Sequence, residues 1–189
     1  MNGGVVVLIV VGVTVLVPLI WLIATYNRFV SLRTHMSESW HDVDVELKRR
    51  HDLIPNLVET VKGYAAHERE TFDRVIEARA RAMAHAGPDA TLGRDESELA
   101  RGVGRLFALA EGYPDLKASE NFLALQKELA LTEDRIAAAR RFFNANVREL
   151  NQLCGMFPTN IVAGMFGFHP AAFFELSSEA ERVVPRVSI

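Results

Sequence analysis

The sequence predicts an all-α protein: an antiparallel, up-and-down bundle of the four-helix type with long helices, preceded by one N-terminal transmembrane helix. Three observations predict it. Residues 3–25 are uncharged and mostly apolar, two long stretches repeat apolar residues at steps of three and four, and no stretch alternates like a strand. We expect an N-terminal transmembrane anchor at 1–27, a helical bundle at 28–157, and an aromatic-rich C-terminal segment with an extended tail at 158–189.

The run at 3–25 is long enough to cross a bilayer. At about 1.5 Å of rise per residue, a helix over this run reaches roughly 30 Å. A cleavable signal peptide has a shorter apolar core and a basic leader, whereas only Met1 and Asn2 precede this run. Trp21 and Tyr26 are of the amphipathic type that settles at a membrane surface. We therefore expect a retained, single-pass anchor in contact with membrane lipid.

A helical face starts at Trp40 and keeps its three-and-four stepping as far as Glu68. It passes through Pro55 in phase, although proline removes one backbone hydrogen bond. Two interpretations stay open here: a kinked helix, or a tight turn with Asp52 as N-cap that reverses the chain. The face continues to Met83, and HAGPDATLGRDES then has the composition of a polar loop.

A shorter helix is predicted over Glu96–Glu111, ended by Gly112, Tyr113 and Pro114. The clearest pattern follows, an apolar stripe from Phe122 to Phe157. No proline or glycine interrupts residues 119–154, so this stretch predicts one helix of about 55 Å. A stripe of that length needs antiparallel partners to cover it, which predicts the bundle.

Several sequence blocks together resemble the LemA family of bacterial membrane-anchored helical proteins. They are YNRFVSLR, SWHDVDVELKRRHDLIPNLVETVKGYAAHERET, YPDLKASENFLALQ, TEDRIAAARRFFNANVRELN, FPTNIVAGMFGF and VPRVSI. The resemblance implies an antiparallel four-helix bundle on one N-terminal membrane helix, in the bacterial inner membrane with the N-terminus outside. It also implies a molecular role that is undetermined, with some members linked to membrane zinc metalloproteases.

No complete catalytic, cofactor or metal motif is found, and we expect a protein that is not an enzyme. His67-Glu68-Arg69-Glu70-Thr71 begins like a zinc-protease motif, but the second histidine is replaced by Thr71. His35, His41 and His51 are interpreted as solvated or capping side chains. The formal net charge of -3, with interleaved signs, gives no electrostatic basis for binding nucleic acid.

Two groups of residues remain as candidate sites. Polar side chains on or beside the apolar stripes predict a buried network of Arg50, Glu68, Glu133, Arg140 and Asn144, in which Glu68 faces Arg140. Aromatic residues after Phe157 predict an interaction surface made of Phe166, Phe168, Phe173 and Phe174. Packing of these rings on the end of the bundle is the open alternative.

These features together predict a non-catalytic, membrane-anchored helical scaffold or adaptor that engages other membrane proteins, possible partners being the membrane metalloproteases implied by the resemblance. The alternative is a structural or membrane-shaping protein that self-associates as a homo-oligomer at the membrane surface. Lipid dependence separates the two hypotheses.

The flanks of the apolar run predict its orientation. Arg28 and Arg33 follow the run before the first acid, Glu38, and no basic residue precedes it, so the N-terminus is expected outside and the bundle in the cytoplasm. A cysteine introduced at Asn2 should react with a membrane-impermeant thiol reagent in intact cells, and Cys154 should not. Labelling of Cys154 alone would reverse the orientation.

Overall fold

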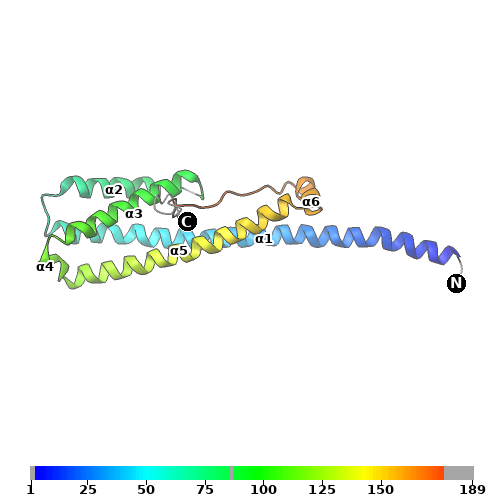
Figure 1. Ribbon diagram of the computed structural model, residues 1–189, viewed down its shortest axis with the longest axis horizontal. Helices are drawn as coiled ribbons and strands as arrows, with labels where there is room; N and C mark the ends of the chain where they lie inside the picture. Colours follow the sequence, from blue (N-terminus) through cyan, green and yellow to red (C-terminus); the bar gives the residue numbers. More distant parts are fainter. Residues whose placement is uncertain (1–2, 86, 177–189) are drawn as a thin grey trace, which may run out of the picture. The chain divides into compact units, whose positions relative to one another are not determined.

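The computed structural model describes residues 3–85 and 87–176, which form six helices and contain no strand (Figure 1). The all-α prediction is therefore confirmed. The helices are α1 (Gly3–Lys62), α2 (Arg69–Met83), α3 (Ala90–Ala110), α4 (Pro114–Lys117), α5 (Glu120–Gly155) and α6 (Thr159–Phe166). The long helix predicted over 119–154 is α5, displaced by one residue.

The chain divides into two compact units. The anchor unit contains residues 1–39 and 144–171, and the bundle unit contains residues 40–143 and 172–189. Helices α1 and α5 each contribute to both units. The boundaries expected from composition, after residues 27 and 157, both fall within the anchor unit.

In the anchor unit, α1 begins with exposed apolar side chains and becomes covered only near Thr25. It is the one helix in the described part of the chain that is long and apolar enough to cross a membrane. Further along, α1 packs against the end of α5 and against α6 (Figure 1). The buried residues of this contact are apolar: Phe29, Leu32, Leu150, Leu153, Val162 and Ala163.

The chain after α6 is tied back to α5 by a side-chain amide. Asn151 Nδ2 donates to the carbonyl oxygen of Ala171 at 2.9 Å, and its Oδ1 accepts from the N–H of Ala171 at 2.8 Å. Gly167 ends α6 with φ of 72°, a left-handed conformation that favours glycine. Residues 168–171 are therefore held in place although they have no regular structure.

In the bundle unit, the second part of α1 and the first part of α5 run antiparallel. Trp40 packs on Phe143 with ring centres 5.4 Å apart, and Arg50 contacts Glu133. Arg50 follows Trp40 by ten residues on α1, and its partner Glu133 precedes Phe143 by ten residues on α5, as antiparallel helices require. Helices α2 and α3 complete the apolar core, which includes Ile54, Leu57, Phe72, Val75, Leu99, Leu106 and Leu129.

The open question at Pro55 is answered by an unbroken helix. Pro55 lies inside α1 and cannot donate to the carbonyl of His51, four residues earlier. Arg79 of α2 supplies the missing donor, since its Nε donates to the carbonyl oxygen of His51 at 2.6 Å. The chain reverses instead at residues 63–68, between α1 and α2.

The predicted polar loop is shorter than expected, because α3 begins at Ala90 and not near Glu96. The side chain of Asp89 accepts a hydrogen bond from the N–H of Leu92 at 2.6 Å and so caps the helix. Leu92 and Gly93 are buried on this first turn. The stretch is polar because only a narrow face of this capped helix is buried.

The contact between Arg79 and His51 leads to a prediction. Changing Arg79 to Met should lower the free energy of unfolding by about 1 to 3 kcal/mol, because a buried carbonyl loses its donor. In a Pro55→Ala background the same change should cost less, because the alanine supplies a backbone N–H to that carbonyl. Urea unfolding of the full chain in detergent, followed by helicity, measures both costs.

Arg74→Met is the matched control on α2, since Arg74 is exposed and pairs with Glu70 at the surface, and it should change stability little. An equal cost of Arg79→Met in both backgrounds would show that the contact acts independently of the proline.

Candidate functional site

The largest fully buried side chain of the bundle unit is that of Arg50. Helix α1 places it on the apolar stripe, facing α3 and α5. Its Nη2 donates to Glu96 Oε2, and its Nη1 donates to Glu133 Oε1 at 2.8 Å. Glu96 is itself fully buried, and its other oxygen lies 2.8 Å from His51 Nε2.

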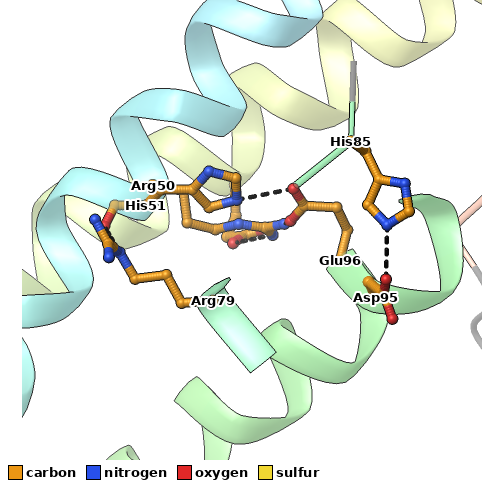
Figure 2. A network of polar contacts seen from close by, with 7 residues as sticks. Arg50, His51, Arg79, His85, Asp95 and Glu96 are labelled. Atoms are coloured by element: carbon orange, nitrogen blue, oxygen red, sulfur yellow. Dashed lines mark hydrogen bonds and ion pairs between the residues drawn. The ribbon is translucent and has the colours of Figure 1, made fainter. Parts of the chain in front are cut away.

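Figure 2 shows Glu96 reaching from α3 toward Arg50 and His51, which are neighbours on α1. Burial alone would lower the pKa of Arg50, but the charges of Glu96 and Glu133 outweigh it and raise the pKa. Burial would likewise raise the pKa of Glu96, but the hydrogen bond with His51 and the charge of Arg50 hold that pKa below its ordinary value. Both groups therefore stay charged in the interior.

A second polar pair lies beside this cluster (Figure 2). His85 Nε2 is 2.7 Å from Asp95 Oδ2, and that hydrogen bond raises the pKa of His85. Between the two groups is a groove of about 180 Å³, lined by Trp40, Asp44, Leu47, Lys48, His51, Asp52, Ala82, Met83, His85, Leu92 and Glu96. Within the described residues, no group of three histidine, cysteine or acidic side chains is placed to hold a metal ion.

The structure brings together only part of the predicted polar network. Arg50 and Glu133 pair directly. Glu68 and Arg140, both half-buried, form no ion pair in the described part of the chain. Glu68 follows the end of α1, whereas Arg140 lies on α5 level with the stretch of α1 near Trp40. Asn144 is half-buried and belongs to the anchor unit.

Two members of the cluster were missed by the sequence analysis. Glu96 was expected where the polar loop meets the start of the shorter helix and was given no role in the network. His51 was interpreted as solvated or capping, although only 6% of it is exposed. The position of Arg50 on an apolar stripe was the one signal in the sequence that could have indicated these partners. A buried guanidinium needs more than one acceptor, and Glu133 can supply only some of them.

The predicted interaction surface divides into inward and outward rings. Phe174 is buried and packs edge-on to Trp40 with ring centres 5.3 Å apart. Phe168 stacks on Phe29 at 4.7 Å. Phe166 and Phe173 remain 47% and 41% exposed. Packing therefore accounts for Phe168 and Phe174, and only the other two are available to a partner.

Other large apolar side chains are at least as exposed as Phe173 and were not among the four phenylalanines of the predicted surface. In the anchor unit they surround the turn between α5 and α6: Met156, Phe157, Ile161 and Met165. On α5 in the bundle unit they are Leu123, Leu131 and Phe142.

Comparison with known proteins gives consistent matches. A sequence profile of the LemA family matches residues 39–189. Magnetosome protein MamQ 2 of Paramagnetospirillum magneticum is 26% identical over 201 residues, which cover 92% of this chain and 74% of that protein. Protein LemA of Metamycoplasma hominis is 31% identical over 137 residues, which cover 72% of this chain and 62% of that protein.

The cluster around Arg50 leads to a stability prediction. Glu96→Gln should lower the free energy of unfolding by about 3 to 5 kcal/mol, because it leaves a buried guanidinium with one charged partner. Urea unfolding of the full chain in detergent at neutral pH measures the loss. Glu70→Gln removes an exposed acid and should leave stability close to wild type. Equal stability of the two variants would show that the Arg50 cluster is not coupled to folding.

The same variant should also show a pH dependence. Because folding lowers the pKa of Glu96, its stabilisation is complete above the ordinary value of about 4.5 and is lost as pH falls through the lower folded value. The stability difference between wild type and Glu96→Gln should therefore shrink in acid. A difference that stays constant to low pH would contradict the charged state assigned to Glu96.

Proposed function

The chain belongs to the LemA family, and from this premise we propose that it is a non-catalytic, membrane-anchored helical scaffold that holds other membrane proteins. The observation that carries the proposal is α1. It passes from an exposed apolar stretch, suited to a membrane, into the core of the bundle unit without a break at Pro55. The anchor and a core helix of the bundle unit thus belong to one continuous helix.

The proposed docking surface is the outer face of α5 in the bundle unit. Leu131 and Phe142 are 41% and 59% exposed. They are eleven residues apart, which is close to three helical turns, so they share one face of the helix. Large exposed apolar side chains at helical spacing suit a helix of a partner protein. Membrane proteins, including membrane zinc metalloproteases, are the proposed partner class.

The proposed orientation puts the N-terminus outside the inner membrane and the bundle unit in the cytoplasm. Support comes from the arginines that follow the apolar run. In this orientation, the outer face of α5 is available to the cytoplasmic parts of neighbouring membrane proteins.

A photocrosslinking amino acid at Phe142 tests the scaffold proposal in the full chain in its native membrane. We expect adducts with one or a few membrane proteins, because the probe replaces an apolar contact of the docking face. The same probe at Gln126, an exposed polar position elsewhere on α5, should give few adducts.

Adducts of twice the chain mass alone would instead support the alternative, a self-associating structural protein. Equal labelling from Phe142 and Gln126, or none from either, would contradict a docking face on α5.

A further inference from the structure

A group of exposed apolar residues in the anchor unit is explained neither by the core nor by the proposed docking face. It occupies residues 156–166, the turn after α5 together with α6, which we call the elbow. Phe157 is 80% exposed, Met165 65%, Met156 57% and Ile161 52%. Side chains of this size are costly to leave in water as a contiguous group.

The sequence around the elbow is also without formal charge. No Asp, Glu, Lys or Arg occurs from Leu150 to Phe174. A protein surface in water normally mixes both signs of charge with its apolar residues. Such a long uncharged stretch is characteristic of chain in contact with lipid or with other protein.

The position of the elbow decides between contact with lipid and contact with another protein. The ring of Phe166 lies 4.8 Å from the ring of Tyr26, the residue that follows the apolar run of α1. Leu22, within that run, packs against the cluster that contains Val162 and Ala163 of α6. The elbow therefore lies beside the last turn of the membrane span.

The depth of the elbow follows from that contact. If residues 3–25 lie in the hydrocarbon core, Leu22 and Tyr26 lie at its edge, because the helix rises about 1.5 Å per residue. Segments that bind at this boundary bury their apolar side about 5 to 10 Å into the layer between headgroups and acyl chains. Phe157, Ile161 and Met165 are side chains suited to that layer.

From this placement we propose that the elbow inserts into the surface of the same membrane that holds α1, and so forms a second lipid contact of the protein. The proposal goes beyond the scaffold role and requires only that α1 spans the membrane. Insertion covers the exposed apolar side chains with lipid. It also fixes the rotation of α1, because one side of the helix is then bound to an interfacial element.

The polar surroundings agree with a membrane surface. A groove of about 550 Å³ adjoins the elbow, lined by Tyr26, Val30, Arg33, Thr34, Ser37, Phe166 and Phe168. Arg33 is exposed there, two turns beyond the end of the apolar run. An exposed guanidinium in the same groove as these aromatic rings is placed to meet lipid phosphates.

Depth-dependent quenching tests the proposal on the full chain in vesicles of phosphatidylcholine and phosphatidylglycerol. In a Cys154→Ala background, Phe157→Cys and Met165→Cys each carry an environment-sensitive fluorophore. Both positions are exposed, so the label does not disturb packing. Ala145→Cys, an exposed position on α5 in the same unit, is the matched control.

We expect both elbow labels to emit at shorter wavelength than the control and to be quenched by lipids with a nitroxide high in the acyl chain. Quenching of these labels by iodide should be several-fold weaker than at Ala145. Iodide quenching equal to the control would show an elbow in water and overturn the proposal. Protection from iodide without lipid quenching would show that protein covers the elbow, and would overturn it equally. If that protection disappears on dilution in lipid, the covering protein is a second copy.

Discussion

The arrangement of the bundle unit depends on one buried charge. Arg50 is enclosed on the apolar stripe of α1, and its partners come from two other helices, Glu96 from α3 and Glu133 from α5. An isolated guanidinium in that position would cost several kcal/mol, so the core can close only when both carboxylates are in reach. A core of leucine and valine alone tolerates sliding of one helix along another. The Arg50 cluster does not tolerate such sliding, because a shift of one helical turn would separate Arg50 from Glu96 and Glu133.

Much of the helical architecture could be predicted, and the exceptions have local causes. Helix α5 was found nearly to the residue because its stripe is long and has no proline or interior glycine. Pro55 left α1 ambiguous, since its consequence depends on Arg79, a donor that belongs to another helix. The reversal at residues 63–68 was missed because the apolar spacing of α1 continues in phase across it into α2. The spacing of apolar residues cannot reveal a turn when the same spacing continues in phase on both sides of it.

The candidate site was less predictable, because it depends on contacts between distant residues. Arg50 stood out as a charge on an apolar stripe and Glu133 as a charge beside the next stripe, but the sequence did not indicate that the two pair. Glu96 was hidden in a stretch whose composition suggested a loop. In the C-terminal segment, phenylalanines without helical periodicity carry no directional signal. Only the structure shows that Phe174 faces Trp40 while Phe173 faces outward.

The separation of Arg50 from its partners along the chain also has a consequence during synthesis. Glu96 follows Arg50 by 46 residues and Glu133 by 83. At about 5 to 20 residues per second, the ribosome needs roughly 4 to 17 s to add the second carboxylate. Throughout that interval the guanidinium of Arg50 lacks the carboxylate of Glu133, and water must solvate it in its place. Because burying a guanidinium without its partners is costly, the charge opposes closure of the core before α5 has been made.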